Sequence, residues 1–144
     1  MKKSFLLFLL VFIINSTAFT AERFPIPLEK ENNLYIEDKI FNVKNINIEA
    51  TMSRPTAAFK PINFTFEFKE DDNLLEIQKG KIQFNMKMDM GNYSQELKKD
   101  GAKYTATAVL PKCMMGGEIW FAKLSFEINN EFYSKVFFFE IPNK

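Results

Sequence analysis

Sulfur-bearing side chains are the residues of this sequence whose type and spacing point most directly to chemistry. The chain has 144 residues, with seven methionines and one cysteine. Most of this sulfur lies in one region, at Met86, Met88, Met90, Cys113, Met114 and Met115. Thioether and thiolate are soft ligands that select cuprous copper, whereas zinc, calcium and magnesium do not favour thioethers. The pattern therefore predicts copper(I) as the cofactor, with the Cys113 thiol deprotonated by the metal it binds.

The same residues have a simpler interpretation as packing. Methionine fills irregular cores well, and a buried cysteine is often an inert small hydrophobe. Core packing is the simpler expectation for Met86, which lies deepest in the strand we expect over residues 82–90. Met88 and Met90, nearer the end of that strand, fit either interpretation. Met114 and Met115 stand in an expected loop and are harder to explain as core.

Composition excludes several classes of function. The sequence contains no histidine, which removes histidine-based acid–base catalysis, histidine-activated nucleophiles and histidine-ligated metal sites. No set of carboxylates has a sequence reason to converge, so we expect no enzyme. Lys+Arg is 19 and Asp+Glu is 18, a balance unlike the basic stripe of a nucleic-acid binder. We therefore expect no nucleic-acid partner.

The first residues have the features of a secretory signal peptide. Lys2 and Lys3 precede an unbroken apolar run over 5–14, and small residues follow near Ala18 and Ala21. The run is too short to span a bilayer, although an uncleaved N-terminal anchor is the alternative. We expect a signal peptide over 1–21, cleaved near Ala18 or Ala21, and a periplasmic protein with no membrane association after cleavage.

Hydrophobic alternation with a period of two predicts the fold. After an irregular lead-in over 22–38, the sequence alternates in short runs separated by turn signals. A shift of phase near Lys44-Asn45 suggests a bulge or a change of sheet. Residues 136–139 are apolar on both faces, so we expect their strand to be covered on both sides or to pair centrally. We predict one domain over 39–144, an all-β, immunoglobulin-like antiparallel sandwich of about 7–9 strands, with Trp120 between the sheets.

Several of these motifs resemble the YtkA-like family of exported bacterial proteins. The similar stretches are Met88-Asp89-Met90-Gly91, Asp100-Gly101-Ala102-Lys103-Tyr104, Leu110-Pro111-Lys112-Cys113, and Gly117 with Trp120. The resemblance covers roughly residues 40–128, most clearly 80–126, and the Leu-Pro-x-Cys motif is typical of a subset of the family. The resemblance implies an immunoglobulin-like sandwich. It also implies a role in periplasmic copper handling, with Met88, Met90 and Cys113 as the candidate ligands.

The resulting hypothesis is a periplasmic accessory protein that captures or delivers cuprous ion. The resemblance implies a copper chaperone or a respiratory oxidase assembly protein as its partner. The alternative is a metal-free interaction module of the envelope, because a sandwich scaffold does not fix a function. The two hypotheses differ on whether the sulfur side chains from the expected strand and loop meet at one end of the domain.

Overall fold

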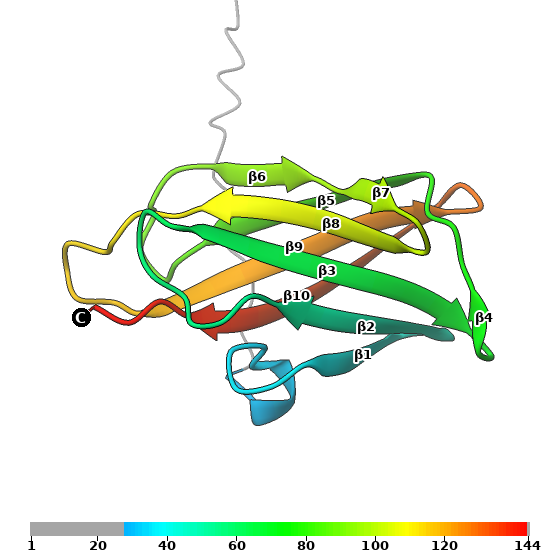
Figure 1. Cartoon of the computed structure of the whole chain (residues 1–144), viewed down its shortest axis with the longest axis horizontal. Coiled ribbons are helices and arrows are strands. Elements are labelled where there is room, and N and C mark those ends of the chain that lie inside the picture. Colours follow the sequence, from blue (N-terminus) through cyan, green and yellow to red (C-terminus); the bar gives the residue numbers. More distant parts are fainter. Residues whose placement is uncertain (1–27, 144) are drawn as a thin grey trace, which may run out of the picture.

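The chain forms two antiparallel sheets packed face to face (Figure 1), as the computed structural model shows over residues 28–143. The elements are the short 3-10 helix η1 (Lys30–Asn32) and the strands β1 (Lys39–Val43), β2 (Ile46–Met52), β3 (Pro61–Glu70), β4 (Asn73–Leu74), β5 (Lys79–Asn85), β6 (Tyr93–Glu96), β7 (Lys98–Asp100), β8 (Lys103–Val109), β9 (Ile119–Ile128) and β10 (Glu131–Glu140). The predicted all-β, immunoglobulin-like sandwich is confirmed. Residues 28–143 form ten strands, more than the 7–9 expected. Two of the ten, β4 and β7, have only two and three residues and give little signal in the sequence.

One sheet has the order β1-β2-β3-β8-β7, with β4 paired to β3, and the other has the order β10-β9-β5-β6. Alternating residues of both sheets point into a shared core that is rich in phenylalanine. Phe64 of the first sheet contacts Phe84 and Phe139 of the second, with ring centroids 5.3 Å apart in both pairs. Trp120 is 1% exposed, as expected for a residue between the sheets. Aromatic burial of this kind dominates the energetics of small sandwich cores.

Tight turns join successive strands where the sequence has polar pairs. Asp71-Asp72 and Asn129-Asn130 adopt positive φ and close two-residue hairpins, as type I′ turns require. Lys44-Asn45 also closes a two-residue hairpin, since Val43 pairs with Ile46, although only Lys44 has a positive φ. The bulge or change of sheet expected there is therefore wrong. The phase shift arises because the chain reverses and two residues leave the ladder.

Strand β10 lies at the edge of its sheet, so the expectation that it pairs centrally is wrong. Both of its faces are nonetheless covered where it is apolar. Phe137 points into the main core, while Phe138 packs on the outer face against Phe121. A bridge between Asn33 and Phe138 covers the free edge, with the Leu34 amide donating to the Phe138 carbonyl at 2.9 Å.

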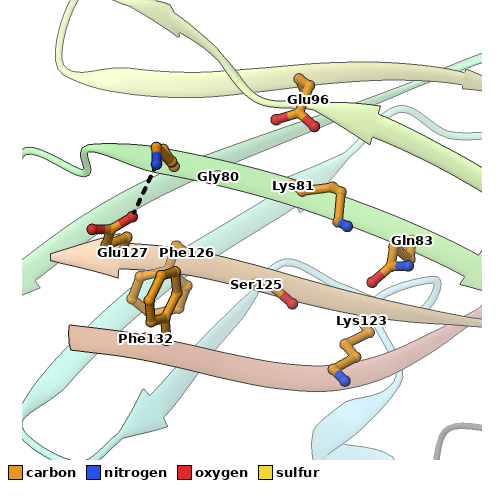
Figure 2. Close-up of a pocket in the computed structure, with 10 residues that line it drawn as sticks. Gly80, Lys81, Gln83, Glu96, Lys123, Ser125, Phe126, Glu127 and Phe132 are labelled. Atoms are coloured by element: carbon orange, nitrogen blue, oxygen red, sulfur yellow. Dashed lines mark ion pairs between the residues drawn. The ribbon is translucent and has the colours of Figure 1, made fainter. Parts of the chain in front are cut away.

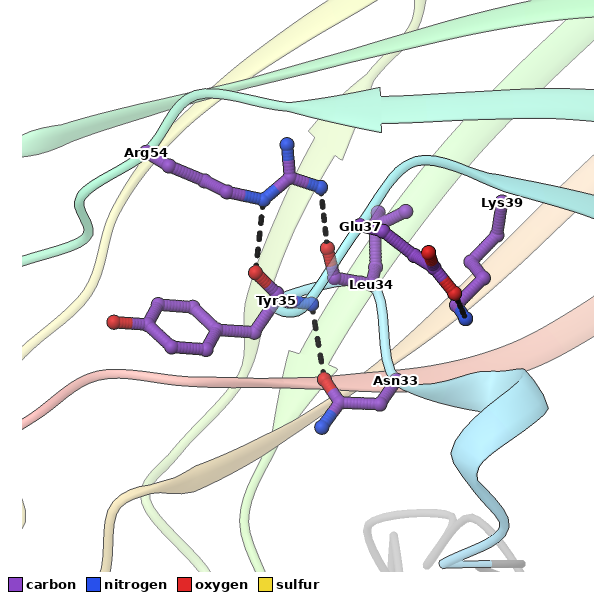
Figure 3. Close-up of polar contacts among 6 residues, drawn as sticks. All are labelled: Asn33, Leu34, Tyr35, Glu37, Lys39 and Arg54. Atoms are coloured by element: carbon purple, nitrogen blue, oxygen red, sulfur yellow. Dashed lines mark hydrogen bonds and ion pairs between the residues drawn. The ribbon is translucent and has the colours of Figure 1, made fainter.

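Arg54 fastens this N-terminal segment to the sandwich (Figure 3). Its guanidinium donates to the carbonyls of Tyr35 (2.8 Å) and Leu34 (2.7 Å) and pairs with Asp38 at 2.9 Å. Leu34 itself is fully buried in the core. Residues 28–38, expected as an irregular lead-in, thus contain no strand but pack as part of the domain. The predicted signal peptide lies outside the described residues. Over 28–143 no helix is long and apolar enough to cross a membrane.

Candidate metal-binding pocket

A largely apolar pocket of about 300 Å³ opens at one end of the sandwich, between the loop after β5 and the loop between β8 and β9. Both loops lie on the left in Figure 1. Four of the six predicted ligands line the pocket: Met86, Met88, Cys113 and Met115. Leu28, Ile119 and Phe121 supply apolar wall, while Lys87 and Glu118 supply the charged side chains of the lining. Two separate loops therefore contribute sulfur-bearing side chains to the lining of one pocket.

The strand that was expected over 82–90 is shorter than predicted, because β5 ends at Asn85. The Asn85 side-chain oxygen accepts a hydrogen bond from the Met86 amide at 2.8 Å, which competes with continuation of the ladder. The partner on one side also ends here, since β6 begins at Tyr93, which pairs with Phe84. On the other side β9 begins at Ile119, beyond Phe121, the partner of Asn85. Met86, Met88 and Met90 consequently lie in a loop and do not share one strand face.

The floor of the pocket consists of Met86 and Cys113, which are 8% and 4% exposed. Both pack on the backbone of Gly117. A Cβ placed on Gly117 would lie 3.1 Å from Met86 Cε and 3.4 Å from Cys113 Sγ. A side chain at this position would crowd Met86, so Gly117 lets Met86 and Cys113 pack closely on the same stretch of backbone.

The rim of the pocket consists of Met88 and Met115, which are 46% and 75% exposed. Met115 lies in a turn that the Gly116 amide closes by donating to the Cys113 carbonyl at 3.1 Å. Gly116 has φ of 81°, a conformation that side chains disfavour. This turn places Cys113 inside the pocket and Met115 at its mouth.

The end of the chain holds the sulfur-bearing loop in place. The Asn143 side-chain amide donates to the Gly116 carbonyl at 2.9 Å, and the Asn143 backbone N–H donates to the Glu118 carboxylate at 2.8 Å. Lys112 in turn donates to the Asn143 carbonyl at 3.0 Å. These contacts bracket the segment 112–118 on both sides. Cys113 is therefore presented by a fastened loop.

The two remaining candidates lie outside the pocket lining. Met90 is half-buried and packs against the main core, and Met114 is 93% exposed. Met90, a candidate ligand that the family resemblance implies, therefore does not line the pocket with Cys113, whereas Met86 does. Residues 28–143 contain no group of three or more His, Cys, Asp or Glu side chains that could hold a metal ion. A metal in this pocket would depend on thioether sulfur.

Sequence reasoning missed the contributions of Gly117 and Asn143. Two adjacent glycines can mark a place where side chains pack closely on the backbone. From the sequence alone, however, Gly116 and Gly117 indicate only a loop. Nothing in the spacing of Asn143 indicates that it bonds residues 25 to 27 positions earlier.

Comparison with known proteins adds no relative. No family model matches the chain, and no curated protein or solved structure matches it.

Proposed function

We propose that this chain is an exported accessory protein that binds cuprous ion in the pocket lined by Met86, Met88, Cys113 and Met115. The observation that carries the proposal is the convergence of these four sulfur side chains, from two loops, on one largely apolar pocket. Thiolate and thioether together suit copper(I), which accepts soft ligands at low coordination number. The apolar wall favours this choice, because it offers no ring of oxygen ligands for a hard cation.

The difference in burial between floor and rim suggests how cargo is exchanged. Met86 and Cys113 are withdrawn from solvent and would retain the ion. Met88 and Met115 are exposed and can be replaced one at a time by the sulfur ligands of a partner. Handover by stepwise replacement keeps the ion coordinated throughout. The proposed partner is a periplasmic copper chaperone or a respiratory oxidase assembly protein.

Titration of the purified protein with Cu(I) against a competing chelator tests this function. Cys113→Ser and Met86→Leu should each weaken binding by at least roughly tenfold, since loss of even a supporting group commonly costs that much. Met90→Leu and Met114→Leu are matched controls, because they remove the same thioether outside the pocket, and should leave affinity unchanged. Equal affinity in the wild type and in Cys113→Ser/Met86→Leu would refute the site.

A metal-free interaction module is the competing proposal, and exposed apolar side chains favour it. Met114 and Met115 are 93% and 75% exposed, and Phe59, whose amide donates to the Leu110 carbonyl, is 67% exposed. Apolar groups exposed together commonly mark a contact surface. Native mass spectrometry of protein from copper-supplemented cells separates the two, because only the first predicts bound metal.

A further inference from the structure

A second hollow lies on the outer face of the β10-β9-β5-β6 sheet (Figure 2). Its volume is about 430 Å³, within the usual range for small-ligand sites. Its lining includes Lys79, Lys81, Lys123, Ser125, Glu127 and Phe132. It shares no lining residue with the sulfur pocket. The hollow is therefore a candidate site distinct from the sulfur pocket.

Glu127 supplies a buried acceptor at one end of this hollow. The residue is 9% exposed, and its Oε2 has no hydrogen-bond donor among the described residues. Lys79 Nζ is the cation beside it, at 3.8 Å, beyond hydrogen-bond distance and on a side chain that is 80% exposed. A buried carboxylate oxygen without a donor is costly. A ligand that brings a hydroxyl or amine to this point would satisfy it.

Lys81 supplies a positive charge further along the same face. Strand pairing sets Lys79 opposite Glu127 and Lys81 opposite Ser125. Over residues 28–143 the Lys81 ammonium forms no ion pair, although Glu96 lies opposite it on β6. Lys123 stands one step beyond Ser125 on this face and already has an interaction within the protein. Lys81 is therefore the cation that a ligand can engage here, with Ser125 beside it as a neutral donor.

Phe132 supplies an apolar surface beside Glu127. The two residues are cross-strand partners, and the Phe132 ring is 78% exposed. Figure 2 shows Phe132 at the end of the hollow where Glu127 lies, with Lys81 and Lys123 toward the other end. An exposed ring beside a buried acceptor suits a ligand with one apolar face and polar edges.

Together these groups define the chemistry of a ligand. It must donate hydrogen bonds to Glu127, carry an anion for Lys81, and lay an apolar face on Phe132. The rows of Glu127 and Lys81 are two residues apart along the strands, about 6.6 Å. That is the span of one six-membered sugar ring bearing a carboxylate. We propose that this face binds an acidic saccharide, through sugar hydroxyls at Glu127, a carboxylate at Lys81 and a ring face on Phe132.

The test uses the purified full chain and a trimer of galacturonic acid. Binding is followed through backbone amide shifts in NMR. We expect saturable shifts at Lys81, Ser125 and Glu127, with weaker binding as salt is added. Lys81→Gln should lower the affinity by at least roughly tenfold, the lower end of the range for a lost charge-assisted hydrogen bond. Phe132→Ala, a surface change that spares the core, should lower it as well. Lys98→Gln, on β7 of the other sheet, is the matched control.

Two further ligands decide the ligand class. Maltotriose has similar size and hydroxyls without charge, and triglutamate has the charge without sugar rings. Both should bind at least fivefold more weakly than the acidic trimer. Absence of saturable shifts with the acidic trimer overturns the proposal. Equal binding of maltotriose or triglutamate also overturns it, the latter by indicating an acidic-peptide surface.

Discussion

Met86 and Cys113 reach the same point above the backbone of Gly117, although they come from loops on either side of β6, β7 and β8. Met86 Cε lies 3.1 Å, and Cys113 Sγ 3.4 Å, from the position a Cβ would take on that glycine. Glycine at position 117 lets Met86 pack beside Cys113 more closely than a residue with a side chain would.

Gly117→Ala should therefore weaken copper binding while preserving the sandwich. The added methyl group would lie 3.1 Å from Met86 Cε, so the Met86 side chain must shift from its position beside Cys113. We expect Cu(I) affinity to fall by roughly tenfold, the scale seen when the support of a ligand is lost. Chelator competition measures the affinity, and far-UV circular dichroism checks the fold. Unchanged affinity would show that the floor residues do not act together.

Asn143→Ala should loosen the loop that carries Cys113. The substitution removes the side-chain hydrogen bond to the Gly116 carbonyl, and it leaves the strands intact. We expect faster hydrogen exchange at residues 113–118 and faster loss of bound Cu(I) to a chelator. Asn73→Ala is the matched control, because Asn73 makes a similar bond to the Asp71 carbonyl in the β3–β4 turn. Equal exchange rates in both variants would contradict the fastening role.

Arg54→Ala should destabilise the fold through the N-terminal segment. It removes donors to the Leu34 and Tyr35 carbonyls and the partner of Asp38. The expected loss is about 1–3 kcal/mol, the usual cost of charged hydrogen bonds at a partly buried position. Urea unfolding measures it. Arg54→Lys keeps the charge without the paired donors and should recover less than half of the loss.

Gly80→Ala should also destabilise the fold, for a steric reason. A Cβ at this position would lie 2.6 Å from Ile77 Cδ1 and 2.6 Å from Leu97 Cδ1. Both side chains must move, and overpacking of this kind costs about 1–3 kcal/mol. Thermal unfolding gives the measurement. A variant that also carries Leu97→Ala should tolerate the change better, because one of the clashing side chains is then absent.

The pH dependence of stability should change in Glu67→Gln. A hydrogen bond from Lys69 holds the pKa of Glu67 below its usual value of 4.5. A lowered folded-state pKa stabilises the fold above the unfolded value, and this contribution is lost as the pH falls through the folded value. The free energy of unfolding of the variant should therefore depend less on pH between about 6 and 3. Identical pH profiles would show that the pair of Glu67 and Lys69 contributes nothing measurable.

The fold was predictable because its signals are local. Ile62, Phe64, Phe66 and Phe68 are buried along β3, as their alternation indicates, and polar pairs mark the hairpins. The length of β5 was not predictable in the same way. Alternation continues to Met90, but β6 pairs with β5 only as far as Phe84, and the Asn85 side chain accepts a hydrogen bond from the Met86 amide. Neither feature can be inferred from the alternation of β5 itself.

The candidate site was predictable in composition and only partly in membership. The residue types identified Met86, Met88, Cys113 and Met115 as ligands, together with Met90 and Met114, which the pocket leaves out. Loop conformation decides between them, because adjacent residues such as Met114 and Met115 face differently in a turn. The residues of the outer-face hollow were likewise not predictable without the strand register. Glu127 and Lys79 are far apart in the chain and meet only across β9 and β5.

The covering of the β10 edge has a consequence for how the protein is made. The contact between Asn33 and Glu140 joins positions 107 residues apart. Asn33, near the start of the domain, can therefore make this contact only after almost the whole domain has been synthesised. Such distant pairing slows folding. Until it forms, the newly made β10 presents an open row of backbone donors and acceptors to other chains. A full-length molecule in which this contact has not yet formed, or a truncated one lacking residues 33 and 34, is therefore the species in which intermolecular strand pairing should begin.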